Sequence, residues 1–80
     1  MKLPRDLSGE QLVTALCRNW DYRRVHQVGS HIILETATPS HQRLAIPGHA
    51  ALKVGTLGSI LRTVATHKNV SRDRILETIR

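Results

Sequence analysis

The stretch YRRVHQVGSHIILETATPSHQRLAI, residues 22–46, decides the fold of this chain. It consists of short segments rich in β-branched and apolar residues, separated by residues that favour turns. Three strands are expected within it, at residues 22–28, 31–36 and 42–46. Gly29 and Ser30 form the first turn, and residues 37–40, which include a proline unsuited to a central strand, form the second.

Side chains alternate between the two faces of a strand, and this alternation predicts which residues of the second and third strands are buried. The expected core residues are Ile32, Leu34, Leu44 and Ile46. The other face of the second strand then carries His31, Ile33 and Glu35. The sequence therefore predicts that His31 lies on the face of the sheet that no helix covers.

The first strand has no clear alternation. Tyr22 and Val28 would share one side and Val25 the other, which leaves open the side that faces the core. Its adjacent arginines, Arg23 and Arg24, point to opposite faces, so both cannot line one groove equally well.

A helix is expected before the strands. Ser8 and Gln11 have the spacing of a capping box, and Leu7 with Leu12 forms the matching hydrophobic staple. These features predict a helix over residues 8–18. Its inward stripe comprises Leu12, Val13, Leu16 and Trp20.

Two further helices are expected after the strands. Thr56 is predicted to cap the first of them, whose core-facing stripe comprises Leu57, Ile60, Leu61 and Val64. Ser71 caps the second, and Val70 forms a hydrophobic staple with Ile75. Its buried residues are Ile75, Leu76 and Ile79.

The predicted order is helix, three strands, helix, helix. With 80 residues the chain has room for one domain, residues 1–80. The fold class is therefore α+β, with an antiparallel three-stranded sheet covered by helices on one side.

The chain is basic, with 12 Lys and Arg against 6 Asp and Glu and a formal charge of +6. This balance favours a polyanionic partner, most simply nucleic acid. The single cysteine, Cys17, excludes an internal disulfide and is expected to pack as a small hydrophobic residue. The longest apolar run, residues 32–34, is too short for a membrane span, and no signal peptide is evident, so a cytoplasmic protein is expected.

The segment Gly29, Ser30 and His31, at the end of the first strand, is the clearest candidate for a catalytic site. RNA cleavage needs one proton removed from the 2′-hydroxyl and one given to the departing 5′-oxygen, and histidine exchanges protons near neutral pH. A glycine allows close approach of the backbone to a phosphate, and a serine offers a hydroxyl donor. The alternative is that His31 is an ordinary surface or capping residue.

A second candidate anion site is the start of the second helix, at Val54, Gly55 and Thr56, where free backbone amides meet the positive end of the helix dipole. The alternative is a helix start that is simply well capped. Basic side chains that would line a phosphate path between the two points are Arg23, Arg24, Lys53 and Arg62.

Neither a metal nor another cofactor is expected. The histidines at 26, 31, 41 and 49 have irregular spacing, without an HExxH motif or a cysteine pair. Two aromatic residues, Trp20 and Tyr22, are also too few for a base-stacking platform.

Several segments in register resemble the HicA (YcfA-like) toxins of bacterial and archaeal toxin–antitoxin pairs. The segments are GSH at 29–31, IPGH at 46–49 and GTLGSILR at 55–62, behind the basic YRR at 22–24. The resemblance covers the chain from the first helix through the second. It implies a fold like that of double-stranded-RNA-binding domains, which agrees with the element order predicted above.

The resemblance also implies a function. HicA toxins are ribosome-independent mRNA interferases, and the histidine of their Gly-Ser-His motif, here His31, is catalytic. A HicB antitoxin encoded beside the toxin would cover the active site. The chain departs from the family pattern at Gly58, where a basic or polar residue is common, and in its longer tail, residues 68–80, which forms an extension helix of open role. The role of His49 also stays open.

The expected protein is a type II toxin and metal-independent endoribonuclease. It would bind single-stranded mRNA along the sheet, use His31 as general base or acid, and leave a 2′,3′-cyclic phosphate. The residues expected to contact RNA are Arg23, Arg24, Gly29, Ser30, Lys53, Thr56 and Arg62. One titrating group accelerates such a step by about 10² to 10⁴-fold, so slow turnover is expected.

Two alternatives belong to other classes of protein. The first is a non-catalytic RNA-binding module with the same fold, which would bind RNA in a salt-dependent way without cleaving it. The second is a helix-turn-helix DNA-binding protein built from residues 56–64 and 71–79, with residues 68–70 as the turn. The second alternative leaves the three strands and the capped first helix without a role.

Overall fold

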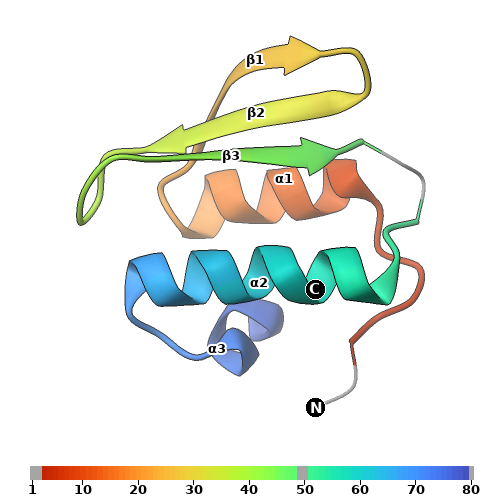
Figure 1. The fold of residues 1–80 in the computed structure, drawn as a ribbon. Helices are drawn as coiled ribbons and strands as arrows, with labels where there is room; N and C mark the ends of the chain where they lie inside the picture. Colours follow the sequence, from red (N-terminus) through yellow and green to blue (C-terminus); the bar gives the residue numbers. More distant parts are fainter. Residues whose placement is uncertain (1–2, 49–50, 80) are drawn as a thin grey trace.

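The predicted order of elements is confirmed by the structure, a computed structural model that describes residues 3–48 and 51–79. The chain forms α1 (Gly9–Asn19), β1 (Arg23–Val28), β2 (His31–Thr36), β3 (Gln42–Pro47), α2 (Val54–Lys68) and α3 (Arg72–Glu77). Figure 1 shows the strands at the top of the view and the helices below them. In the described part of the chain, no helix has both the length and the apolar character needed to cross a membrane.

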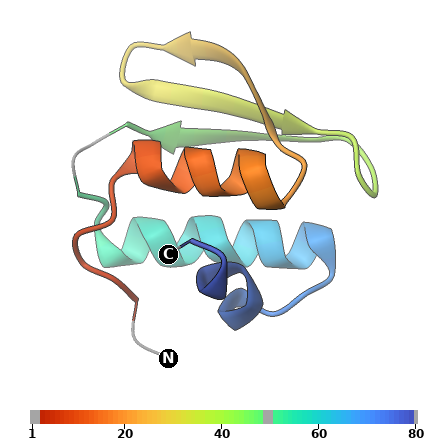
Figure 2. The ribbon, with the colours of Figure 1, turned by 180° about the vertical axis from the view of Figure 1, so that it is seen from behind.

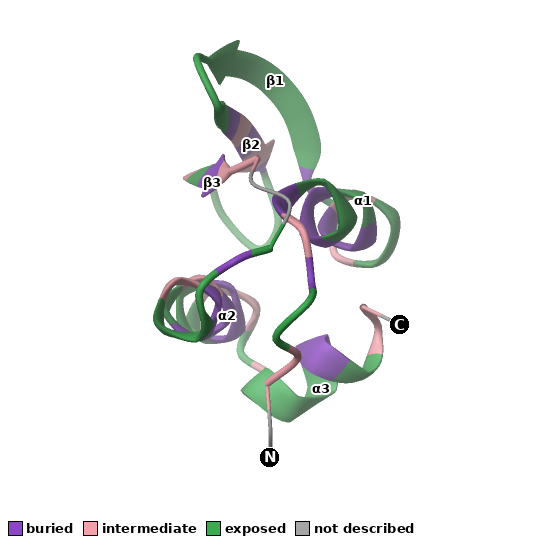
Figure 3. Ribbon diagram, turned by 90° about the vertical axis from the view of Figure 1, so that its right-hand side faces the viewer, coloured by how far each residue is buried: buried purple, intermediate pink, exposed green. Residues whose placement is uncertain are grey.

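The sheet is antiparallel, with the strand order β1-β2-β3. Helix α1 lies against one of its two sides, the side nearer the viewer in Figure 2, whereas α2 lies beyond the edge strand β3, with α3 packed on α2 (Figures 2 and 3). Among residues 3–48 and 51–79, no helix covers the other side of the sheet, which is called the open face below. This α+β architecture with an antiparallel three-stranded sheet is the one that the sequence predicted.

The core fills the space between the sheet and the helices: Figure 3 shows buried residues in β2, β3 and the helices, whereas β1 is exposed throughout. Of the core residues predicted in the strands, Ile32, Leu34 and Ile46 are fully buried, and Leu44 is partly buried against them. Other side chains with no more than 1% exposure are Leu12, Leu16, Leu57, Leu61, Val64 and Ile75. The alternation of buried and exposed residues along β2 is regular, as expected for a central strand with one covered face.

Two of the three predicted helix caps are confirmed. The Gln11 N–H donates to Ser8 Oγ at 3.0 Å, and the Ser8 N–H donates to Gln11 Oε1 at 2.9 Å, which completes the capping box. Ser71 Oγ accepts from the Arg74 N–H at 3.1 Å at the start of α3. Both caps satisfy amides that the first helical turn leaves without intrahelical partners.

The predicted Thr56 cap is wrong. The cap position is Lys53, whose side chain makes no capping hydrogen bond, and Thr56 is the third residue within α2. The helix begins earlier because the chain is fixed just before it: Leu52 is buried, and its N–H donates to Leu7 O at 2.8 Å. The Leu57 N–H then bonds to Lys53 O at 2.9 Å, which is the first helical bond.

Strand β1 contains a bulge that the sequence did not reveal. The pairing with β2 shifts register between Arg24 and His26. Tyr22 and Val28, which simple alternation places on one side, are consequently separated: Tyr22 is buried on the helix side, whereas Val28 is 58% exposed.

The C-terminal tail extends the core. Ile75 and Leu76 of α3 are buried, and Ile79 packs on the same cluster. Helix α2 itself runs through Lys68, the position at which the tail was expected to begin. The tail is therefore part of the domain's packing, in addition to any contact that it makes with other molecules.

Lys68 ties the end of α2 to the β2–β3 loop. Its Nζ donates to Thr36 Oγ1 at 2.9 Å and to Thr38 O at 2.6 Å, and it lies 4.8 Å from the centre of the Tyr22 ring. Burial lowers the pKa of Lys68 and raises the pKa of Tyr22 from 10.0 to about 12. The partly desolvated ammonium group of Lys68 therefore holds the β2–β3 loop against the end of α2.

Helix α1 begins in close contact with the end of β3. A Cβ atom at Gly9 would lie 1.8 Å from Pro47 O, so the buried Gly9 allows an approach that no other residue permits without movement. The Gly48 N–H donates to Ser30 O at 2.6 Å, which joins the same segment to the β1–β2 turn. Backbone contacts therefore join the start of α1, the end of β3 and the β1–β2 turn at one end of the molecule.

Replacing Gly9 with alanine should destabilise the protein by roughly 1 to 3 kcal/mol, because the backbone must shift to admit the methyl group. Urea unfolding followed by the fluorescence of the single tryptophan measures this loss. Gly55→Ala is the matched control, since a Cβ atom there would meet nothing within 4 Å, and alanine favours a helix. Equal stability of Gly9→Ala and the unmodified protein would contradict the close contact.

Candidate nucleic-acid interface and catalytic histidine

The open face is defined by the pairing of the three strands. Residues directly opposite one another in an antiparallel pair share a face, so the pairs that contain His31, Ile33 and Glu35 identify its members. The open face comprises Arg23, His26 and Val28 of β1, His31, Ile33 and Glu35 of β2, and Arg43, Ala45 and Pro47 of β3. It combines imidazoles and arginines with small apolar side chains.

His31 occupies the position predicted for it. It is the first residue of β2, its side chain is exposed, and it lies between Val28 of β1 and Pro47 of β3. The two-residue turn before it contains Gly29 in the left-handed region, with φ of 58°. A rigid turn and a paired strand thus hold an imidazole in contact with solvent.

The predicted second anion site lies at the same end of the molecule as His31. The β1–β2 turn, the end of β3 and the start of α2 all lie at the right-hand end of Figure 1. Lys53 is exposed at the cap position, and Thr56 is partly buried in the first turn. The structure therefore brings Gly29, Ser30, Lys53 and Thr56 to the end that His31 occupies.

The predicted arginine path is not assembled on one surface. Arg23 is on the open face but pairs with Glu35, at the other end of the hairpin from His31. Val28 lies five positions after Arg23, which corresponds to roughly 16 Å along a strand. Arg23 can therefore contact RNA several nucleotides away from His31, but cannot contact the same phosphate.

Arg24 and Arg62 lie away from the open face. Arg24 pairs with the buried Leu34, which places it on the helix side, and its guanidinium binds Glu10 of α1 at 2.6 Å. Arg62 is exposed in the middle of α2 and borders a surface hollow with Gln42. Neither side chain lies on the surface that His31 faces.

At the end of the open face distant from His31, a carboxylate offsets part of the positive charge. Glu35 Oε2 lies 3.3 Å from Arg43 Nη1, and Glu35 Oε1 lies 3.4 Å from His41 Nε2. The side chains of His41 and Arg43 are largely exposed and that of Glu35 is partly buried, so solvent weakens both pairs and each contributes little to stability. Arg23 and Arg43 together still give this end more positive than negative charge.

His26 also lies on the open face, a position that the sequence did not predict. The bulge obscured the alternation of β1. The two-residue turn nevertheless fixes the register where β1 ends, because it pairs Val28 with His31. His26, two residues before Val28, therefore lies on the same face as both. His26 is exposed, like His31. The hairpin register was the feature from which this placement could have been predicted.

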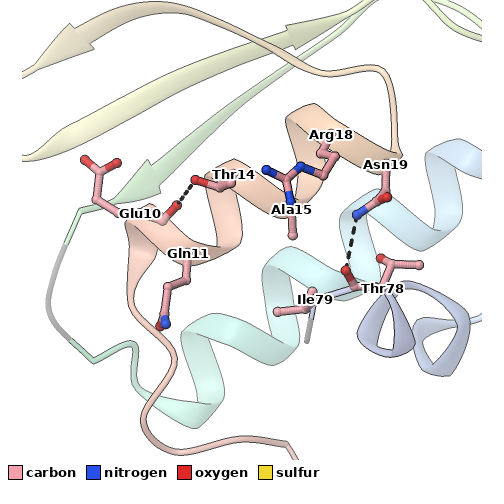
Figure 4. Close-up of a pocket in the computed structure, with 8 residues that line it drawn as sticks. All are labelled: Glu10, Gln11, Thr14, Ala15, Arg18, Asn19, Thr78 and Ile79. Carbon is pink, nitrogen blue, oxygen red and sulfur yellow. Dashed lines mark hydrogen bonds between the residues drawn. The ribbon is translucent and has the colours of Figure 1, made fainter.

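Other features of the molecule do not form part of this site. The pocket in Figure 4, with a volume of about 340 Å³, lies between α1 and the end of the chain, where Asn19 Nδ2 donates to Thr78 O at 3.2 Å. It is on the helix side and does not include His31. Cys17 is partly buried against the core, and burial raises the pKa of its thiol, as expected for a packing residue.

Metal ligands do not converge within the described ranges. No group of three His, Cys, Asp or Glu side chains in residues 3–48 and 51–79 has a geometry that holds a metal ion. His49, whose role the sequence left open, lies outside the described residues.

Comparison with protein-family models, curated proteins and solved structures gives no match. The resemblance to HicA toxins consequently stays a prediction from the segments quoted above. The function is therefore argued from the chemistry and position of the open-face residues.

Arg23 and Arg24 provide a matched test of which face binds RNA. In a His31→Ala background, which prevents cleavage, Arg23→Ala should reduce the slope of log K against log salt by about 0.7 for single-stranded RNA. Arg24→Ala should leave the slope unchanged, because this arginine is on the helix side and bound to Glu10. Fluorescence anisotropy with a labelled RNA measures both slopes, and equal losses would contradict binding on the open face.

Proposed function

We propose that this protein is a metal-independent endoribonuclease that cleaves single-stranded mRNA with His31. The observation that carries the proposal is the position of His31, exposed on the open face directly after the Gly29-Ser30 turn. A group that exchanges protons with RNA must be reachable by the ribose, and this face has no helix over it.

The chemistry requires only groups that the site holds. An imidazole takes the proton of the 2′-hydroxyl, or gives one to the 5′-oxygen, while the 2′-oxygen attacks phosphorus. Ser30 offers a hydroxyl donor beside the phosphate, and Lys53 adds a positive charge at the same end of the molecule. In this proposal Ser30 positions the phosphate, and Lys53 contributes longer-range attraction to the RNA backbone.

RNA would run along the open face from His31 toward Arg23 and Arg43. Between these ends lie Ile33 and Ala45, which offer apolar contact to ribose and bases. The +6 charge supplies the sequence-independent attraction to the phosphate backbone. This arrangement suits a flexible single strand more than a platform of stacked bases, because the nine paired residues of the open face include no Phe, Tyr or Trp.

The resemblance to HicA toxins supports a biological role as the toxin of a type II toxin–antitoxin pair. Its partner would be a HicB-type antitoxin that covers the open face around His31. Because no helix of the described residues covers the open face, a protein surface can exclude RNA from it by direct occlusion. A cytoplasmic location follows from the proposed substrate.

A non-catalytic RNA-binding module is the second candidate, favoured by the position of Arg23. The arginine lies about 16 Å from the turn along β1, so the positive charge of the face is not concentrated at His31. This candidate predicts the same binding without cleavage. The helix-turn-helix alternative is less well supported, because α3 has six residues and buries Ile75 and Leu76.

His31→Ala should lower the rate of RNA cleavage by about 10² to 10⁴-fold, because it removes a proton-transfer group. Incubation of the purified variants with an end-labelled transcript in the presence of EDTA measures the rate. Growth arrest on expression should be lost in parallel.

Val28→Ala is the control, since it shortens the neighbour of His31 on the same face without changing a titratable group. It should retain cleavage, and both variants should unfold at the temperature of the unmodified protein because both positions are exposed. A His31→Ala protein that cleaves RNA at full rate would overturn the proposed function. RNA binding by a wild-type protein that never cleaves would favour the binding module.

A further inference from the structure

His26 and His31 are diagonal neighbours on the open face. Val28 pairs with His31 and His26 pairs with Ile33, so His26 lies two residues from the partner of His31 and on the same side of the sheet. Diagonal neighbours in an antiparallel pair are about 7 to 8 Å apart, within reach of long or aromatic side chains. Both imidazoles are exposed. The two rings can therefore approach one phosphate group from different sides.

This juxtaposition is fixed by the turn. The register between residues 26–28 and 31–33 is regular, and the bulge lies before it, between Arg24 and His26. The irregular part of β1 therefore leaves the position of His26 relative to His31 unchanged. A shift of one residue in the hairpin would move one imidazole to the helix side.

His26 is also the titratable side chain that the sheet places next to His31. The described residues that face His31 directly are Val28 and Pro47, and those diagonal to it are His26 and Ala45. Of these four, only His26 can gain or lose a proton near neutral pH. The charged residues of the open face, Arg23, Glu35 and Arg43, are at the other end of the strands.

Cleavage of RNA through the 2′-hydroxyl needs two proton transfers. The bond from the 2′-oxygen to phosphorus forms, and the bond from phosphorus to the 5′-oxygen breaks. A base accepts the proton of the 2′-hydroxyl, and an acid gives a proton to the 5′-oxygen. The products are a 2′,3′-cyclic phosphate and a 5′-hydroxyl, and exchange with water returns both imidazoles to their starting protonation states.

We infer that His26 and His31 form a general acid–base pair, in which His26 performs the proton transfer that His31 does not. The inference rests on the proposed function, and it adds a second catalytic residue to it. One imidazole acts as the base and the other as the acid, so neither a metal ion nor a solvent molecule has to perform the second proton transfer.

The test uses an RNA with one cleavable linkage, prepared with either oxygen or sulfur at the bridging 5′ position. Sulfur is a good leaving group and departs without a proton. On the oxygen substrate, His26→Ala and His31→Ala should each lower the cleavage rate by about 10² to 10⁴-fold. On the sulfur substrate, the variant that lacks the acid should recover most of the wild-type rate, and the variant that lacks the base should not.

His41→Ala is the matched control, because His41 is also exposed but lies just before β3, beside Glu35. It should cleave both substrates at the wild-type rate, and all variants should keep the thermal unfolding temperature of the wild type. Full activity of His26→Ala beside an inactive His31→Ala would overturn the pair but leave the proposed function. Recovery of both variants or of neither with sulfur would also overturn the pair, and a wild-type protein without cleavage would overturn both proposals.

Discussion

The two-residue turn at Gly29 and Ser30 is the constraint on which the rest of this structure depends. It sets the register of β1 against β2, and the register decides which side chains face the helices and which face solvent. A slip of one residue would move His31 into the core and Ile32 out of it. Burial of the Ile32 side chain favours the observed register by roughly 1.5 to 3 kcal/mol. The hydrophobic core therefore keeps the imidazole exposed.

The turn is itself held by the rest of the fold. Ser30 O accepts from the Gly48 N–H, and the preceding residue, Pro47, contacts the start of α1 at Gly9. At the opposite end, Lys68 ties α2 to the β2–β3 loop. The sheet is thus fixed at both ends, while its open face carries no helix. A small domain can in this way combine a rigid scaffold with an accessible reactive surface.

Much of the fold could be predicted from local patterns. The Ser8 capping box, the turn residues and the alternation along β2 each specify a structure through neighbouring residues, and all three predictions are confirmed. The position of His31 followed from the same alternation. The site could be predicted to this extent because the turn and its register are local in sequence.

The remaining features depend on contacts between distant parts of the chain. The bulge in β1, the early start of α2 at Val54 and the Lys68 contact with Thr38 have no counterpart in a local pattern. Arg24 was predicted to contact RNA, yet it pairs with Glu10, a partner fourteen residues away. Packing decides whether Arg23 or Arg24 reaches the open face. No short sequence motif specifies this choice.

The central claim is that cleavage occurs by proton transfer to and from imidazoles on the open face, without a metal ion. The most direct measurement is the chemical identity of the ends that the protein leaves on RNA, determined by mass spectrometry after digestion in EDTA. This mechanism predicts a 2′,3′-cyclic phosphate on one fragment and a 5′-hydroxyl on the other. A 3′-hydroxyl together with a 5′-phosphate would contradict it, because those ends require attack by water instead of the ribose.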